Sequence, residues 1–215
     1  MAHLVVKELL GVEEPLPDIA PHRDIAGLGL SDDPRYAAGL AKIFAYENTF
    51  LTTEPRLDIT AVPLERTGRY DFVTSSDVFE HVNPPVQRAF DGARALLKPG
   101  GVLVLTVPFT LAARTVEHFP ELHDWRLEQV GDAWRLDNTT ADGRRQIFDH
   151  VVFHQGPGPD GTPAPSLEMR VFARTALEDA CRDAGFARVR FVTEGCPAFG
   201  IEWPEPFSMP IVAYA

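Results

Sequence analysis

Cysteine is scarce in this chain, since only Cys181 and Cys196 occur among 215 residues and they do not form a C-x-x-C pair. A disulfide scaffold and a cysteine-rich structural zinc site are therefore unsupported, and the sequence favours a reducing compartment. Long apolar runs are also lacking, because no stretch approaches the roughly 20 apolar residues of a membrane span, and the N-terminus has no signal-peptide pattern. These observations predict a cytoplasmic protein with no membrane partner.

Basic residues are outnumbered, with 20 lysines and arginines against 31 acidic residues and a net charge of −11. Nucleic-acid binding draws much of its affinity from lysine and arginine on phosphates, so a small-molecule substrate is favoured over a nucleic acid. The G-x-S-x-G, H-E-x-x-H and P-loop motifs are also missing, which removes the common hydrolase, zinc-protease and nucleotide-hydrolysing functions. The length predicts a single domain, residues 1–215.

The middle of the chain has the order strand, polar corner, helix, turn and strand. Phe72 to Thr74 is a short apolar run that the polar residues 75–77 interrupt. Residues 83–97 combine an asparagine N-cap, two prolines in the first helical turn and apolar side chains at helical spacing. Residues 98–101 end that helix, and Val102 to Val107 is an apolar run interrupted only by Thr106. The pattern predicts one βαβ unit of a parallel sheet.

This unit resembles part of the class I S-adenosylmethionine-dependent methyltransferases. The residues that carry the resemblance are Tyr70 to Val82, which end in Glu80-His81-Val82, followed by Lys98-Pro99-Gly100-Gly101. The resemblance covers residues 25–110 and 174–215. It implies an α/β fold, with a doubly wound, seven-stranded mixed sheet whose last strand is antiparallel, and S-adenosylmethionine as cofactor.

In this family the first strand ends in a glycine-rich loop beneath the cofactor, because only glycine lets the backbone approach so closely. The resemblance places Gly27, Gly29 and Ser31 in that loop, although the acidic residue that should precede the glycines is missing. Residues 25–32 also match the family's second strand, and in that alignment the cofactor loop would be absent. We prefer the first alignment, because residues 46–51, 57–60 and 70–74 then supply the second, third and fourth strands.

The same alignment assigns further cofactor contacts. Glu54 follows the second strand, where the family places a carboxylate on the ribose hydroxyls, and two ionised oxygens suit a vicinal diol. Asp58 and Ile59 resemble the family's residues near the adenine, while Ser76 and Asp77 stand at the tip of the fourth strand. Each of the two carboxylates Glu54 and Asp58 also has a structural interpretation, as a solvated loop residue and as a turn cap respectively.

Residues 111–165 are too many for a plain connection in a compact domain and lie outside the resemblance. They contain alternating or β-branched runs at 125–130, 133–137 and 146–153, separated by turn signals. We expect an antiparallel, β-rich insertion, and its place after the fifth strand predicts a lid over the ligand-binding edge. The segment 156–163 is rich in glycine and proline and is expected to form a mobile tip.

Histidines are the candidate catalytic residues, because an imidazole titrates near neutrality and can act as a general base. His81, His118, His123 and His154 are expected at or beside the active edge, although a structural role for each stays open. His150 and His154 have the four-residue spacing of a metal pair, but on a strand this spacing spans about 13 Å. The sequence therefore predicts no metal site.

Together these patterns predict methyl transfer from S-adenosylmethionine to an oxygen or nitrogen of a small metabolite, as in secondary metabolism or sugar modification. The sulfonium already activates the methyl group, so the protein has to align donor and acceptor and exclude water. A methyltransferase-like binding or scaffolding module without catalysis is the alternative. A nicotinamide-dependent reductase is disfavoured by the incomplete dinucleotide fingerprint. A homodimer is left open.

Overall fold

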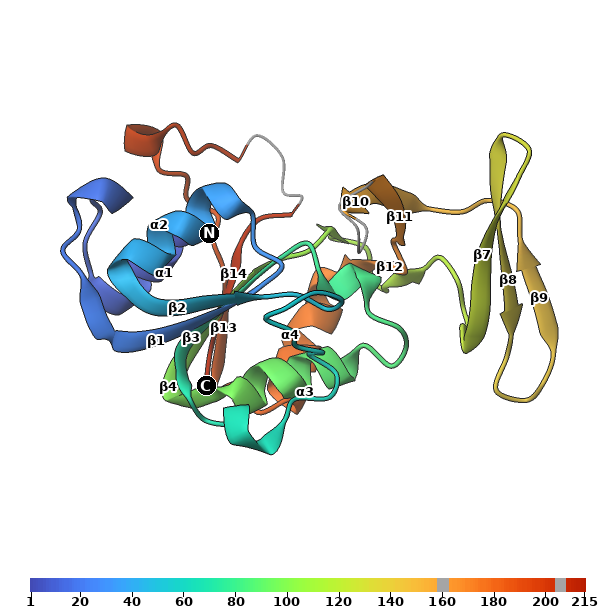
Figure 1. Ribbon diagram of the computed structural model, residues 1–215, viewed down its shortest axis with the longest axis horizontal. Coiled ribbons are helices and arrows are strands. Elements are labelled where there is room, and N and C mark those ends of the chain that lie inside the picture. The colour runs from blue at the N-terminus through green and yellow to red at the C-terminus, as the bar shows by residue number, and fades with distance from the viewer. Residues whose placement is uncertain (158–162, 204–207) are drawn as a thin grey trace.

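A computed structural model describes residues 1–157, 163–203 and 208–215 of the chain. In these residues the main sheet has six strands in the order β13–β14–β4–β3–β1–β2 (Figure 1). The three neighbouring pairs among β1 to β4 are parallel, β14 is antiparallel to β4, and β13 is antiparallel to β14. The strands are β1 (His22–Leu30), β2 (Phe44–Thr49), β3 (Tyr70–Ser76), β4 (Leu97–Thr106), β13 (Arg188–Phe191) and β14 (Ile211–Tyr214).

Two pairs of helices cover the two faces of this sheet (Figure 1). Apolar side chains of α1 (Ala2–Leu10) and α2 (Pro34–Ile43) pack on one face, and those of α3 (Gln87–Leu96) and α4 (Arg174–Asp183) on the other. The predicted βαβ unit is confirmed as β3, α3 and β4, but its expected boundaries are wrong. The helix α3 begins at Gln87, after Asn83 and the two prolines, and residues 98–101 belong to β4 rather than to a turn. No helix in the described ranges is long and apolar enough to cross a membrane. Short 3₁₀ helices occupy Leu16–Asp18 (η1), Leu64–Arg66 (η2), Phe79–His81 (η3) and Pro197–Phe199 (η4).

The expected count of seven strands is wrong for the described part of the chain, because residues 57–60 do not form a strand. Asp58 accepts hydrogen bonds from the backbone N–H and the hydroxyl of Thr60, so its side chain turns the backbone where a strand would continue. Leu57 and Ile59 are buried with the side chains of α3 instead. The apolar alternation in this segment therefore reflects burial under a helix rather than pairing in a sheet.

The position of β1 bears on the two alignments of the first strands. β1 lies between β2 and β3 and is parallel to both. In a doubly wound sheet the first strand lies between the second and the fourth. The observed order fits both alignments, because without a first strand the second strand would take the place beside the fourth; the preferred alignment therefore stays a prediction.

The segment after β4 forms two structural parts. A small sheet, β5 (Phe109–Thr110), β12 (Arg170–Ala173) and β6 (Val116–Glu117), joins the outgoing and the returning chain beside the tip of β4. Beyond it, the runs expected to pair do form an antiparallel sheet that stands away from the main sheet (Figure 1). Its strands are β7 (Asp124–Val130), β8 (Ala133–Thr139) and β9 (Arg145–Phe148).

A hairpin completes the segment. β10 (Phe153–Pro157) pairs antiparallel with β11 (Pro163–Leu167). Most of the expected mobile tip at 156–163, namely residues 158–162, lies outside the described residues. The segment has its own apolar core, which includes Phe119, Leu136 and Met169. The fold of this segment thus depends on its own packing as well as on the main sheet.

Candidate functional site

The carboxyl ends of three neighbouring strands meet at one edge of the main sheet. The register pairs Leu30 of β1 with Ser75 of β3, and Ser76 with Thr106 of β4. The next residues, Ser31 and Asp77, have φ angles of 55° and 52°. Residues other than glycine rarely adopt this left-handed conformation, and strained positions of this kind cluster at ligand sites.

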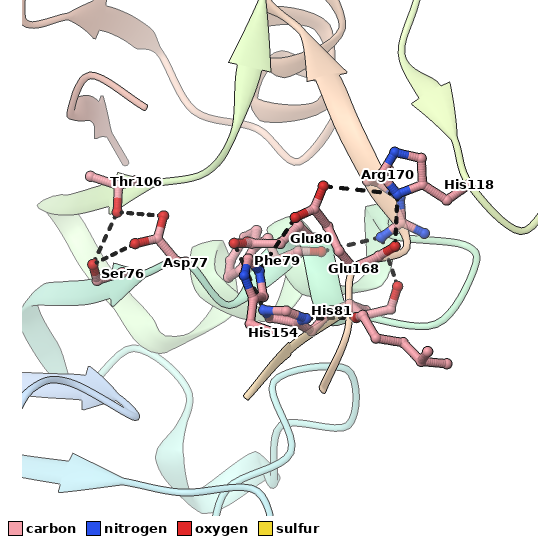
Figure 2. A network of polar contacts seen from close by, with 12 residues as sticks. Ser76, Asp77, Phe79, Glu80, His81, Thr106, His118, His154, Glu168 and Arg170 are labelled. Carbon is pink, nitrogen blue, oxygen red and sulfur yellow. Dashed lines mark hydrogen bonds and ion pairs between the residues drawn. The ribbon is translucent and has the colours of Figure 1, made fainter. Parts of the chain in front are cut away.

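Polar groups gather at the tips of β3 and β4, as Figure 2 shows. The Ser76 hydroxyl lies 3.0 Å from the Thr106 hydroxyl, which donates to a carboxylate oxygen of Asp77 at 3.2 Å. Asp77 is exposed. The predicted cofactor residues Ser76 and Asp77 therefore present an exposed carboxylate at the edge where doubly wound folds bind ligands.

Asp32, directly after the β1 tip, is a buried residue that the sequence did not single out. Its carboxylate accepts hydrogen bonds from the hydroxyls of Tyr36 at 2.7 Å, Tyr46 at 2.5 Å and Thr74. These donors come from α2, β2 and β3 respectively. Burial raises the pKa of Asp32 above its ordinary 3.8, and the three hydroxyl donors oppose this rise. Asp32 thus fixes the strand tips to one another beneath the edge.

Replacing Asp32 by asparagine is expected to change how stability depends on pH. Because the folded-state pKa is raised, the folded protein holds the Asp32 proton more tightly than the unfolded chain does. Wild-type stability should therefore lose a contribution as the pH rises above 3.8, whereas the asparagine cannot titrate. Urea unfolding of both proteins between about pH 4 and 8 measures the difference. The difference should move in favour of D32N with rising pH, and a constant difference would contradict the assignment.

The two glycines expected beneath the cofactor do not form a cradle at this edge. Gly27 and Gly29 are buried inside β1, before its tip. A Cβ atom on Gly27 would lie 2.0 Å from the Phe72 ring, and one on Gly29 would lie 1.9 Å from the Tyr46 hydroxyl. Side chains of β3 and β2 fill the space that these two glycines leave, so both glycines have a packing role inside the sheet.

The other predicted cofactor residues have local partners. Glu54 is exposed and accepts a hydrogen bond from the backbone N–H of Arg56 at 2.9 Å. The Asp58 carboxylate caps the turn to Thr60, which is the structural role predicted as the alternative to cofactor binding. Ile59 is only 6% exposed and belongs to the main core. Of these three residues, Glu54 has the side chain most accessible to a ligand.

Three of the four candidate histidines lie around Glu168, between the main sheet and the β10–β11 hairpin, and two of them, His118 and His154, pair with its carboxylate (Figure 2). His154 Nε2 lies 3.3 Å from one Glu168 oxygen and His118 Nδ1 lies 3.8 Å from the other. The His81 and His154 rings pack edge to face with centroids 5.0 Å apart. His123 is exposed and its backbone N–H donates to the Asn138 side chain. It therefore lies at the start of the outer sheet, which consists of β7, β8 and β9. Sequence spacing does not reveal this grouping, because it joins segments far apart in the chain.

Glu80 lies beside these histidines and is fully buried. Neither of its carboxylate oxygens has a hydrogen-bond partner among the described residues. Burial raises the pKa of Glu80 to about 8, and the nearby Asp77 and Glu168 add to the rise. Burial also lowers the pKa of His81. In the sequence, Glu80 stands out only as part of the methyltransferase resemblance.

A separate cavity of about 220 Å³ lies between α1 and residues 190–203. Its lining includes His3, Glu13, Arg190 and Trp203. The predicted cofactor and catalytic residues are not among the residues that line it. We therefore locate the candidate site at the strand tips and the histidine cluster rather than in this cavity.

The architecture and the polar strand edge define the chain as an α/β protein of the type that binds a cofactor outside the carboxyl ends of parallel strands. The family model described as "Methyltransferase domain" matches residues 19–190. The chain therefore belongs to the class I methyltransferases, enzymes that use S-adenosylmethionine, and the resemblance in the sequence is confirmed. A search of curated protein sequences finds no match.

Solved structures with the same fold come from several bacteria. One is the 1,6-didemethyltoxoflavin-N1-methyltransferase of Burkholderia thailandensis, with 14% identity, 99% of this chain and 76% of that chain covered, and a TM-score of 0.51. Another is an amino pentose methyltransferase of Micromonospora echinaspora involved in calicheamicin biosynthesis, with 17% identity, coverage of 99% and 87%, and a TM-score of 0.51. A third is a sugar N-methyltransferase of Streptoalloteichus, with 13% identity, coverage of 99% and 84%, and a TM-score of 0.52. At these identities the likeness shows the fold.

Proposed function

We propose that this methyltransferase transfers the methyl group of S-adenosylmethionine to an oxygen or nitrogen of a small hydroxylated or amino metabolite. The observation that carries the proposal is the polar edge at the tips of β1, β3 and β4, next to the segment 111–165 that starts from the end of β4. Within that segment, the β10–β11 hairpin, whose His154 packs on His81, acts as a lid over the acceptor. Two structures of similar fold are those of sugar methyltransferases, which supports an acceptor of this class.

The residues at the edge fit the polar groups of the cofactor. In this proposal the exposed Asp77 carboxylate and the hydroxyls of Ser31 and Ser76 hold its charged and hydroxyl groups, and Glu54 takes the ribose diol. Bound there, the cofactor supplies an activated methyl group. Gly27 and Gly29 have no direct part, so the fixed, left-handed turns at Ser31 and Asp77 replace the usual glycine cradle.

The histidine cluster serves the acceptor side. His81 Nδ1 lies 2.6 Å from the carbonyl oxygen of Leu167, which can only accept, so the proton is on Nδ1 and Nε2 is free. His118 Nδ1 has the same relation to the carbonyl of Glu168 at 2.9 Å. Each imidazole is thus held in a state whose Nε2 can take a proton from an acceptor hydroxyl or ammonium. His154 is half exposed on β10, where it pairs with Glu168 and packs against His81.

A non-catalytic binding module is the second candidate, and the filled space in front of Gly27 and Gly29 is the observation in its favour. The two functions differ in one measurable respect. An enzyme releases S-adenosylhomocysteine in the presence of an acceptor, whereas a binding module retains the cofactor unchanged. A screen of amino sugars and hydroxylated aromatics for S-adenosylhomocysteine release distinguishes them.

Calorimetric titration with S-adenosylhomocysteine tests the cofactor site. We expect wild type to bind one equivalent, and we expect Asp77→Ala to bind at least 10-fold more weakly, since a hydrogen bond to a charged group contributes about 1.5–3 kcal/mol. Asp132→Ala, in the exposed turn between β7 and β8, is the matched control and should bind like wild type. Equal affinity of the Asp77 variant and wild type would refute the role of the β3 tip.

A further inference from the structure

Three potential metal ligands lie together at the junction of the main sheet and the β10–β11 hairpin. Glu80 and His81 belong to η3, directly after the β3 tip, and His154 belongs to β10. One carboxylate oxygen and two ring nitrogens from these residues all lie within 4.8 Å of one another. Figure 2 shows the three side chains pointing toward a common space beside Glu168.

Glu80 provides an independent indication of a ligand. A buried carboxylate is costly unless hydrogen bonds or a cation compensate it, and buried polar groups in native proteins are nearly always satisfied. Glu80 is 0% exposed, and both of its oxygens lack a hydrogen-bond partner among the described residues. The nearest cationic candidate, His81 Nε2, is 3.9 Å away, which is too far for a hydrogen bond. A cation between them would satisfy the carboxylate.

The histidines are oriented as metal ligands usually are. A ligating histidine typically donates its other ring N–H to a carbonyl or carboxylate, which fixes the ring and its tautomer. His81 does this through Nδ1 and the Leu167 carbonyl, so that Nε2 presents a lone pair. His154 Nε2 is 3.3 Å from a Glu168 oxygen, so the Glu168 carboxylate lies next to the three proposed ligands.

We propose that Glu80, His81 and His154 bind one divalent transition-metal ion, with Glu168 beside it. Two imidazoles and one carboxylate favour ions such as Zn²⁺, Co²⁺ or Mn²⁺ over Ca²⁺, which takes oxygen ligands. Three protein ligands leave a coordination position for water or for an oxygen of the acceptor. The ion joins η3 of the core to β10, so metal binding and the position of the hairpin are linked. The site does not depend on the proposed methyl transfer; with the ion bound to His81 Nε2, the proton acceptor is His118 Nε2.

The test is titration of the chelator-treated protein with Co²⁺, followed by visible absorbance, and with Zn²⁺, followed by calorimetry, both without cofactor or acceptor. We expect wild type to bind one ion per chain. In His154→Ala and in Glu80→Gln we expect the dissociation constant of the ion to be at least 10-fold higher. His150→Ala is the matched control, because His150 is exposed, four residues from His154, and is not one of the proposed ligands. It should bind like wild type.

Circular dichroism of each variant separates a lost ligand from a lost fold. His154 is half exposed, so its alanine variant is expected to fold even if Glu80→Gln does not. Absence of Co²⁺ and Zn²⁺ binding by wild type would overturn the proposal. So would undiminished binding by a folded His154→Ala variant, since the ion would then be held elsewhere.

Discussion

Gly92→Ala is expected to destabilise the protein by about 3 kcal/mol, the upper part of the range for overpacking. Gly92 is buried in α3, where a Cβ atom would lie 1.9 Å from the backbone carbonyl oxygen of Ile59. A backbone atom cannot rotate away as a flexible side chain does. The helix α3 would therefore have to move away from residues 57–60, the segment that contains Ile59. This cost exceeds the roughly 1 kcal/mol that alanine gains over glycine in a helix.

Gly39→Ala in α2 is the matched control for this prediction. Its Cβ atom would meet Leu16 Cδ1 at 2.7 Å, and this methyl group stands at the far end of a flexible side chain. Both changes gain the same helix propensity, so urea unfolding of the two variants separates the clash from the propensity. Similar free energies of unfolding for the two variants would show that the contact between Gly92 and Ile59 does not determine the stability of the Gly92→Ala variant.

Arg170→Met is expected to cost about 3 kcal/mol or more, because a buried guanidinium leaves several groups without partners when it is removed. Arg170 is 1% exposed. It donates to the carbonyl oxygens of Val82 at 2.7 Å and Phe79 at 3.2 Å, and to Glu117 at 2.9 Å. These bonds tie η3, β6 and β12 together, so the variant should loosen the junction and the whole fold.

Thermal and urea unfolding measure this effect, and Arg135→Met is its control. Arg135 pairs with Asp149 on the exposed face of the outer sheet, where an ion pair contributes at most about 1 kcal/mol. Arg170→Lys keeps the charge but loses the planar fork that reaches several acceptors, so an intermediate loss is expected. An Arg170→Met variant as stable as Arg135→Met would contradict the structural role.

The sequence predicted those parts of the fold that depend on local signals. β3, α3 and β4 follow from apolar runs and helical spacing that lie within the same stretch, whereas the expected asparagine cap and proline-glycine turn do not mark the ends of α3. The prediction of a third strand was wrong because Leu57 and Ile59 are buried against α3. Sequence periodicity shows that these residues are buried but does not identify the element that covers them. Gly27 and Gly29 illustrate a related limit, since the sequence does not distinguish a glycine needed by a neighbouring ring from one needed by a ligand.

The candidate site was predictable only in its parts. Ser76 and Asp77 follow directly from the end of a strand, which sequence patterns locate well. The proximity of His81 to His154 depends on how the hairpin returns to the core, so neither spacing nor charge reveals it. Asp32 and Glu80 were missed because burial of a carboxylate is a tertiary property, whereas the sequence shows only an acidic residue near a turn.

The pairing of β5 with β12 has a consequence for how the chain can vary. Phe109 and Phe172 are partners in one short ladder, so the polypeptide leaves the core and returns to it at adjacent positions. Closing a flexible loop becomes only about 0.6 kcal/mol more costly for each doubling of its length. The core therefore sets almost no limit on the size of what lies between these two residues. Segments of other lengths can be exchanged there, each bringing its own small core, while the strand tips keep their geometry.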